Sequence, residues 1–279
     1  MNPVFITAND LNDAYFSLLW NLWYNGREYE ITSGSFKGDY RLEFDYVSGF
    51  IKYPHVRPLS PIMPEGIPPV TTDEKLETNY FPNYLMNPEL EKNEHYKYSS
   101  WINGIDHYKE YKFYKVDEVN LDNGLWVSDE GLLKLNKETP LEWIIRHFKE
   151  KGYGNNHCYI NVGNVDSGFA YEIPYENEGE RKTSPCLRGL DFKIKDGQLI
   201  TSVVFRSWDL YAGFPENMGG FTLLNEYIAN QLEGVEPGPL AFTSAGLHCY
   251  GYQMEPVMGI LKKEKNEFRQ PIGDKPHRK

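Results

Sequence analysis

The fold is decided by residues 205–232, which read FRSWDLYAGFPENMGGFTLLNEYIANQL. From Gly220 to Leu232 the apolar side chains recur at helical spacing, and their stripe is wide enough to predict a deeply buried helix. Arg206 and Asp209 stand before that helix, where a preceding strand would end. The stretch therefore predicts a strand, a polar loop and a buried helix in succession.

The rest of the chain mixes strand and helix patterns. Leu190–Ile194 and Gln198–Phe205 predict a hairpin, because the Asp-Gly pair between them is a strong turn signal. Further expected elements are strands over 40–51 and 158–162, and helices over 10–25, 74–86 and 140–151. This mixture predicts an α/β (α+β) fold, and no boundary divides the 279 residues into separate domains.

Two segments carry weaker patterns. Residues 54–70 contain six prolines, which predicts an extended connection without helix or strand. Pro82 is expected to bend or break the helix of residues 74–86. Residues 105–138 are charged and aromatic without a clean period, and are interpreted as an excursion from the core.

Composition narrows the classes of function. The formal net charge of −11 argues against a nucleic-acid polymer as substrate, because phosphate backbones are held by basic surfaces. Three cysteines without paired spacing fit a reducing compartment such as the cytoplasm. No stretch is long and apolar enough to span a membrane, and no cysteine or histidine spacing predicts a metal site.

Cys186 is the leading candidate for chemistry. A thiolate is a strong nucleophile, and Arg206, one hairpin away, is expected to lower the thiol pKa and to hold a phosphate. A buried structural cysteine is the alternative, because free cysteine is among the most buried residue types. Cys158 and Cys249 lack such neighbours and are predicted to be core residues.

Three polar residues that follow Cys186 along the chain suit a pyrimidine nucleoside. The Asn217 carboxamide offers a donor and an acceptor, which match a uracil edge; a plain helix N-cap is the alternative. His248 and Tyr250 are two residues apart, so on a strand they face the same side and suit a sugar hydroxyl. A core histidine beside a half-buried tyrosine is the alternative for that pair.

The order and spacing of these motifs resemble the thymidylate synthase family, and its shorter archaeal-type members in particular. The resemblance is strong over residues 184–254 and weaker over 139–163 and the N-terminal turn and strand. It implies an α/β fold with a large mixed sheet flanked by helices, packed sheet to sheet in a homodimer. It also implies a cytoplasmic enzyme that moves a one-carbon unit from 5,10-methylenetetrahydrofolate to C5 of a pyrimidine nucleotide.

On this resemblance the whole chain, 1–279, forms one domain. Its expected parts are an N-terminal helix and phosphate-loop region (10–52), a proline-rich connection (54–70), a catalytic core (139–261) and a polar tail (262–279). Neither a membrane nor a nucleic-acid polymer is an expected partner.

The resemblance also assigns roles to individual residues. Cys186 would add to C6 of the pyrimidine, Arg206 would bind the 5′-phosphate with help from Ser207, and Asn217 would select uracil over cytosine. The other implied roles are contacts to the ring region (Asp209, Gly213), to the 3′-hydroxyl (His248, Tyr250), in a proton relay (Tyr98) and as general base (Glu77 or Glu74).

Three positions depart from the family pattern. Thr32 stands where the N-terminal phosphate loop normally has an arginine, so Arg41 or Lys37 is expected to replace it. Asn156 and His157 stand where an arginine pair normally reaches the partner subunit's phosphate. The long C-terminal segment that closes over folate in bacterial enzymes has no counterpart.

Reductive methylation of dUMP to dTMP is the leading hypothesis. Hydroxymethylation of dUMP or a related pyrimidine nucleotide is the first alternative, because water could capture the intermediate if the site excludes it poorly. A nucleotide- or RNA-binding regulator without turnover and a thiol hydrolase using Cys186 and His248 are the remaining alternatives.

Overall fold

A computed structural model describes most of the chain. The described residues are 2–32, 36–92, 94, 96–104, 138–163, 167 and 184–262, with the backbone of two short strands at 125–127 and 133–135. The interpretation of residues 105–138 as an excursion therefore lies mostly outside the described residues, as does the polar tail beyond Lys262.

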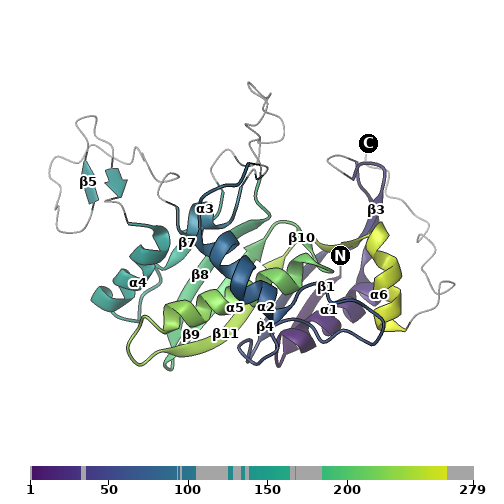
Figure 1. Ribbon diagram of the computed structural model, residues 1–279, viewed down its shortest axis with the longest axis horizontal. Coiled ribbons are helices and arrows are strands. Elements are labelled where there is room, and N and C mark those ends of the chain that lie inside the picture. Colours follow the sequence, from purple (N-terminus) through teal and green to yellow (C-terminus); the bar gives the residue numbers. More distant parts are fainter. Residues whose placement is uncertain are drawn as a thin grey trace, which may run out of the picture.

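The centre of the molecule is a six-stranded mixed sheet (Figure 1). Its order is β1 (Pro3–Ala8), β4 (Tyr46–Ile51), β11 (Glu236–Ser244), β9 (Gln198–Phe205), β8 (Leu187–Lys195) and β7 (Tyr159–Asn161). The pairs β1–β4 and β9–β11 are parallel, and the other neighbours are antiparallel. The predicted hairpin is confirmed, because Lys195 pairs with Gln198 across a turn in which Asp196 and Gly197 both have positive φ.

A smaller sheet carries part of the candidate site. Its order is β10 (Trp208–Asp209), β12 (Leu247–Tyr250), β3 (Tyr40–Glu43) and β2 (Arg27–Glu30). The single strand predicted over 40–51 is therefore wrong: β3 joins this sheet and β4 joins the large one, with a break at residues 44–45. A third pair joins β5 (Leu125–Val127) to β6 (Leu133–Leu135).

The helices largely match the sequence prediction. They are α1 (Leu11–Asn25), α2 (Asp73–Lys75), the π-helix η1 (Leu76–Met86), α3 (Ser99–Ile102), α4 (Pro140–Lys151), α5 (Gly213–Ala229), the 3₁₀ turn η5 (Gly251–Gln253) and α6 (Met254–Leu261). Asp10 and Thr139 cap α1 and α4 through bonds to Asp13 and Glu142. Residues 54–70 contain no helix or strand, as predicted.

Two helical predictions need correction. The buried helix begins at Gly213, seven residues before the predicted start, because Pro215 in the first turn needs no backbone partner and fits there. Pro82 does not end its helix: the segment continues as a π-helix, and Asn87 N donates to the Pro82 carbonyl five residues back.

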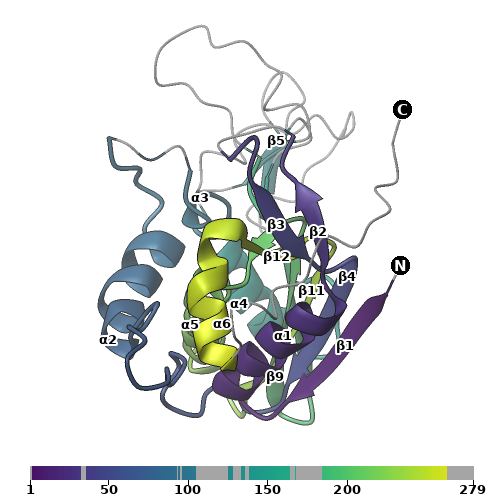
Figure 2. The same cartoon turned by 90° about the vertical axis from the view of Figure 1, so that its right-hand side faces the viewer.

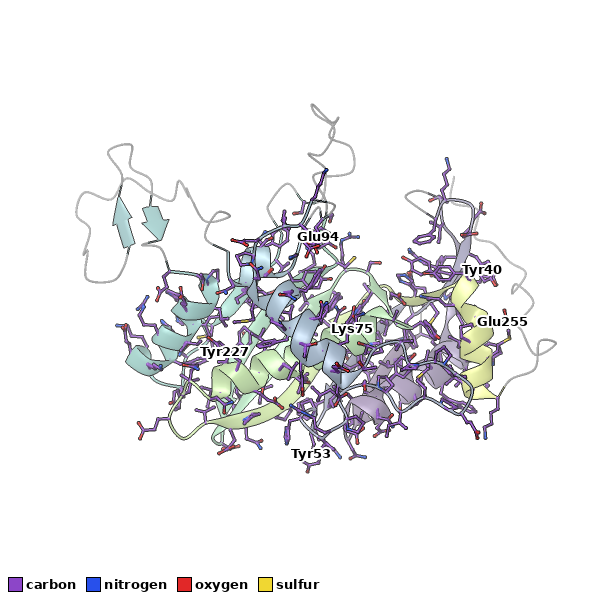
Figure 3. The ribbon with its side chains drawn as sticks, viewed as in Figure 1. Tyr40, Tyr53, Lys75, Glu94, Tyr227 and Glu255 are labelled. Atoms are coloured by element: carbon purple, nitrogen blue, oxygen red, sulfur yellow. The ribbon has the colours of Figure 1, made fainter. Side chains whose placement is uncertain are left out.

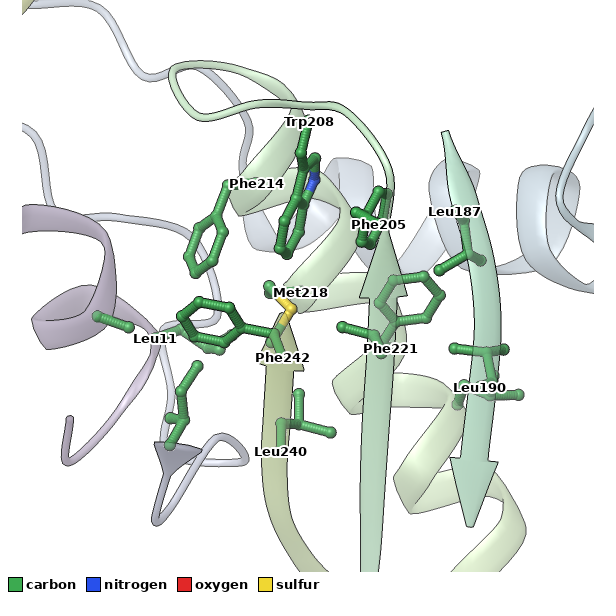
Figure 4. Packing of buried hydrophobic residues seen from close by; sticks show 14 of the residues in the cluster. Leu11, Leu187, Leu190, Phe205, Trp208, Phe214, Met218, Phe221, Leu240 and Phe242 are labelled. Atoms are coloured by element: carbon green, nitrogen blue, oxygen red, sulfur yellow. The ribbon is translucent and has the colours of Figure 1, made fainter. Parts of the chain in front are cut away.

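The long helix α5 lies between the large sheet and η1. Glycines at 219 and 220 allow this close approach, because a Cβ there would collide with Leu76 and Tyr80. On its other side α5 packs on a cluster of buried aromatic residues, drawn close up in Figure 4. The helix therefore links η1 to the strand ends that carry the candidate site.

Among the described residues, helices cover one face of the large sheet and leave the other open (Figure 2). Along β9 the side chains alternate between buried and half-buried, as a strand covered on one face requires. Phe5, Phe50 and Tyr159 are 70%, 38% and 40% exposed. This open face is where the resemblance places a second subunit, and the dimer remains a prediction.

Candidate active site

The thiol of Cys186 lies at the entrance to β8 and is half-buried. Arg206, which follows the paired strand β9, holds the segment in place. Its backbone N donates to the Cys186 carbonyl (3.0 Å), and its side chain donates to the carbonyls of Pro185 (Nε, 3.1 Å) and Ser184 (Nη2, 2.6 Å). The predicted pairing of cysteine and arginine is therefore present, and the guanidinium also fixes the backbone before the thiol.

The acidity of this thiol differs from the prediction. Burial raises the pKa of Cys186, and this effect outweighs the positive charge of Arg206 and a hydrogen bond from Tyr96, which both lower it. The sequence predicts a lowered pKa because it shows the nearby charge but cannot show how deeply the sulfur is enclosed. Arg206 and Tyr96 thus partly offset the cost of forming a thiolate.

Tyrosine rings enclose the region of the thiol. Tyr98 is buried, lies edge-on to Tyr84 (centroids 5.4 Å apart) and contacts Phe205. Burial holds the pKa of Tyr98 well above its ordinary value, with a further contribution from Cys186. The sequence identified Tyr98 but missed Tyr80, Tyr84 and Tyr96. Tyr80 and Tyr84 are four residues apart in a helical segment, a spacing that could have indicated one shared face.

Ser207 and Asp209 follow Arg206 along the chain. Ser207 is half-buried, and its Cα would lie 3.5 Å from a Cβ placed on Gly246. The Asp209 carboxylate accepts from Tyr211 N (2.8 Å), from Ala212 N (3.3 Å) and from Gln253 Nε2 (3.0 Å). Asp209 therefore fixes the loop that leads into α5, and burial raises the pKa of its carboxyl group.

Asn217 is buried inside the second turn of α5. The alternative of an N-cap is wrong, because the helix begins at Gly213 and Ala212 occupies the cap position. Asn217 Oδ1 accepts from Trp208 Nε1 (2.7 Å), and Nδ2 donates to Tyr80 Oη (2.6 Å). A Cβ on Gly213 would lie 3.8 Å from that Oδ1, so Gly213 borders the carboxamide.

His248 and Tyr250 lie on one face of β12, as predicted, with ring centroids 4.6 Å apart. His248 is buried, and its Nδ1 lies 2.8 Å from the Gly246 carbonyl, which requires a proton on Nδ1. Nε2 is then an acceptor, and it is buried with no hydrogen-bond partner among the described residues. Burial lowers the pKa of His248 to about 4, so the ring is neutral near pH 7.

Tyr250 connects the histidine to the thiol. Burial raises the pKa of its hydroxyl, and the charges of Asp209 and Cys186 raise it further. These electrostatic contributions place the Tyr250 hydroxyl near both Asp209 and Cys186. The structure thus groups the predicted residues Cys186, Arg206, Tyr98, Asp209, Gly213, Asn217, His248 and Tyr250.

The proposed substitutes for phosphate-binding arginines are more scattered. Arg41 lies on β3 and pairs with Glu43 (Nε–Oε2, 2.7 Å), so its charge is already partly neutralised. Asn156 and His157 are exposed in the loop before β7, where the His157 ring lies 5.7 Å from that of His147. Lys37, the other proposed substitute, is exposed and follows residues 33–35, which are not described.

The predicted general base lies at the surface. Glu77 is half exposed on η1, and its Oε1 lies 3.9 Å from Arg57 Nε. Arg57 in turn forms two bonds to Glu226 in the distal half of α5. Glu74, the alternative base, is exposed. Figure 3 shows neighbouring Lys75 on the segment that crosses over α5, where it pairs with Glu216 (2.5 Å).

Neither a metal site nor a membrane span is found in the described part of the chain. Its histidine, cysteine and acidic residues form no group of three that could hold a metal ion. Within the same residues, no helix combines the length and the apolar character that crossing a bilayer requires.

Comparison with known proteins finds similarity to one family over the C-terminal part of the chain. Residues 173–272 match the family described as thymidylate synthase. A putative thymidylate synthase from Methanosarcina acetivorans is 38% identical over 78 residues, which are 28% of this chain and 36% of the relative. A protein of the same description from Methanothermobacter thermautotrophicus is 33% identical over 78 residues, 28% of this chain and 35% of the relative. The matched segment thus spans about a third of the length of these relatives.

The fold agrees with that result. Thermostable thymidylate synthase A from Bacillus subtilis superposes with a TM-score of 0.58 at 14% sequence identity, covering 92% of this chain and 85% of the other. The family resemblance and the large mixed sheet flanked by helices, both expected from the sequence, are confirmed.

Proposed function

We propose that this chain, with its thymidylate synthase match over residues 173–272 and the thymidylate synthase fold, transfers a one-carbon unit to C5 of a pyrimidine nucleotide. The observation that carries the proposal is the half-buried Cys186 thiol, held by Arg206 in the same group as the buried carboxamide of Asn217. A thiol nucleophile alone is compatible with many reactions, whereas a carboxamide that can match a pyrimidine edge narrows the choice of substrate.

The thiol starts the reaction. Cys186 Sγ adds to C6 of the pyrimidine, and the electron pair of the 5,6 double bond moves to C5, which becomes the nucleophile. Tyr96 donates to Sγ and Arg206 supplies positive charge, so both favour the thiolate form. Arg206 is also exposed, which suits contact with the 5′-phosphate, and Ser207 is its neighbour on that side.

Recognition of the nucleoside falls to two other residues. After its two bonds within the protein, the Asn217 carboxamide retains one N–H and one lone pair for O4 and N3–H of uracil. The Nε2 of His248, which has no hydrogen-bond partner among the described residues, can accept a hydrogen bond from the 3′-hydroxyl, beside the hydroxyl of Tyr250. The substrate that suits both is dUMP, and we propose dTMP as its product.

The one-carbon donor is proposed to be 5,10-methylenetetrahydrofolate, which supplies a methylene group and the reducing equivalents for a methyl product. The half-buried rings of Tyr84 and Tyr96 lie on the thiol side of the group and fit a flat pterin ring by stacking. Removal of the C5 proton needs a base, and the surface position of Glu77 gives no support to its assignment.

The proposed oligomeric state and cellular location also follow from the family resemblance. We propose a homodimer formed through the open face of the large sheet, which exposes Phe5, Phe50 and Tyr159. In that arrangement Asn156 and His157 would approach the partner subunit's nucleotide. The three cysteines are all unpaired, which fits the reducing cytoplasm.

The test is a covalent trap. Purified protein is incubated with 5-fluoro-dUMP and 5,10-methylenetetrahydrofolate, and the intact mass and its peptide map are measured. We expect one adduct at Cys186, and dTMP with dihydrofolate when dUMP replaces the fluoro compound. A hydroxymethyl product with tetrahydrofolate would mean that the reaction is hydroxymethylation and not methylation. Absence of both adduct and product would refute one-carbon transfer to these nucleotides.

A further inference from the structure

The two hydrogen bonds of Asn217 do not contribute equally to the orientation of its carboxamide. On one side lies the Trp208 indole, whose Nε1 is 2.7 Å from Oδ1. On the other side lies the Tyr80 hydroxyl, 2.6 Å from Nδ2. An indole N–H can only donate, whereas a phenol can donate or accept. Trp208 therefore demands the oxygen of the carboxamide, and Tyr80 would tolerate either end.

The indole itself is held rigidly. Its ring stacks on Phe205 with centroids 3.9 Å apart and planes 2° from parallel. Phe214 lies 4.9 Å away and Phe242 meets the ring edge-on at 5.9 Å. Figure 4 shows Trp208 at the end of this aromatic group, with its nitrogen in blue. Since core side chains leave the ring little freedom, the direction of its N–H is fixed before any ligand arrives.

Carboxamide orientation decides which base a buried asparagine accepts. Uracil presents an acceptor at O4 and a donor at N3, so it needs an N–H opposite O4 and an oxygen opposite N3. Cytosine presents a donor at N4 and an acceptor at N3, which is the reverse. A carboxamide rotated by 180° exchanges its O and N and would therefore suit cytosine. An asparagine that rotates freely would select neither base.

We infer that Trp208 is the positioning residue that makes Asn217 specific for uracil, by holding the carboxamide oxygen on its own side. The inference rests on the proposed function, because it assumes that Asn217 reads the base. Trp208 contributes no contact to the reacting atoms in this account. Tyr80 follows the orientation that Trp208 sets and does not determine it.

The experiment compares the dissociation constants of dUMP and dCMP, by calorimetry, in the wild type and two matched variants. W208F removes the indole N–H and keeps an aromatic ring against Phe205. We expect its preference for dUMP over dCMP to fall about tenfold or more, the factor that one lost hydrogen bond allows. Y80F removes the hydroxyl but leaves the donor of Trp208, so its preference should stay within about twofold of the wild type.

A second form of the protein controls for a folding defect in W208F. Replacing Trp208 with 3-benzothienylalanine exchanges the ring N–H for sulfur in a nearly identical shape, so packing is preserved and the donor alone is lost. It too should lose the preference. If both changes at 208 leave the ratio of dissociation constants unaltered while dUMP still binds, the inference is wrong and the proposed function stands. If the wild type binds neither nucleotide, the proposed function fails and this inference fails with it.

Discussion

Two asparagines on α5, Asn217 near its start and Asn225 in its distal half, are both buried, yet the structure uses them differently. Asn225 Nδ2 donates to the Leu199 carbonyl (2.7 Å) and to Thr201 Oγ1 (2.9 Å), and its Oδ1 accepts from Gly238 N (3.1 Å). Asn217 makes two side-chain bonds. Asn225 therefore ties the helix to β9 and to β11, and Asn217 keeps capacity for a ligand.

The difference teaches how to separate structural from functional polar groups on one helix. A buried carboxamide whose partners include backbone groups of two strands stabilises the fold, because every partner would lose its bond if the side chain were removed. A buried carboxamide whose partners are other side chains, in a group that includes a thiol, fits the proposed role in recognition. Burial alone does not distinguish the two, and the identity of the partners does.

The largest expected effect comes from removing the proposed nucleophile, Cys186. C186A should remove the covalent adduct and lower turnover by at least about 10⁴-fold, because the reaction loses its nucleophile. The trap and product assays measure both. C158A is the matched control, since Cys158 is a buried cysteine in the core and should leave the adduct in place. An adduct that persists in C186A would place the nucleophile elsewhere.

The next largest effect concerns Asn225 and the stability of the fold. N225A should lower the free energy of unfolding by about 3 kcal/mol, because it leaves buried groups of Leu199 and Gly238 without a partner. Urea denaturation measures it, and the ratio of dUMP to dCMP affinity should not change. N230A, at the exposed end of the same helix, should cost less than about 0.5 kcal/mol. Equal losses in the two variants would contradict the assignment of Asn225.

A smaller effect depends on pH. The folded pKa of His248 is about 4, below the ordinary value of 6.5, so in that interval the unfolded chain binds more protons. Stability should therefore fall as the pH drops from about 6.5 to 4. Over this pH range the free energy of unfolding of H248Q should fall by about 2 kcal/mol less than that of the wild type. Parallel stability curves would mean that the pKa of His248 is the same in the folded and the unfolded protein.

The smallest effect concerns the thiol environment. R206Q removes the charge that favours the Cys186 thiolate, so its pKa should rise and alkylation by iodoacetamide at pH 8 should slow about three- to tenfold. R206K keeps a positive charge and should slow the reaction less. The rate of alkylation at Cys186 is measured by peptide mapping. Equal rates in all three proteins would show that Arg206 does not affect the pKa of the thiol.

Much of the fold could be predicted from local signals in the sequence. The Asp-Gly turn gave the hairpin of β8 and β9, and Asp10 and Thr139 marked the starts of α1 and α4. The strand predicted over 40–51 failed because its two halves pair with partners about 200 residues later, in different sheets. Such pairing depends on tertiary contacts, which a local pattern does not contain.

The site was predictable where spacing carried the information. Cys186, Arg206, Asn217 and the His248–Tyr250 pair come together as expected. The acidity of the thiol was not predictable, because it depends on the burial of the sulfur. Trp208 and Tyr80 escaped notice as well, since apolar packing explains an aromatic residue until its hydrogen bond is seen.

The position of β4 in the large sheet has a consequence for the order in which the protein folds. β4 is an early segment, yet it lies between β1 and β11, and Thr243 Oγ1 reaches the Val47 carbonyl 196 residues back. During synthesis the edge of β4 that pairs with β11 stays unpaired until β11 has emerged. We therefore expect slow refolding, and chains that stop before β11 should depend on chaperones to avoid aggregation.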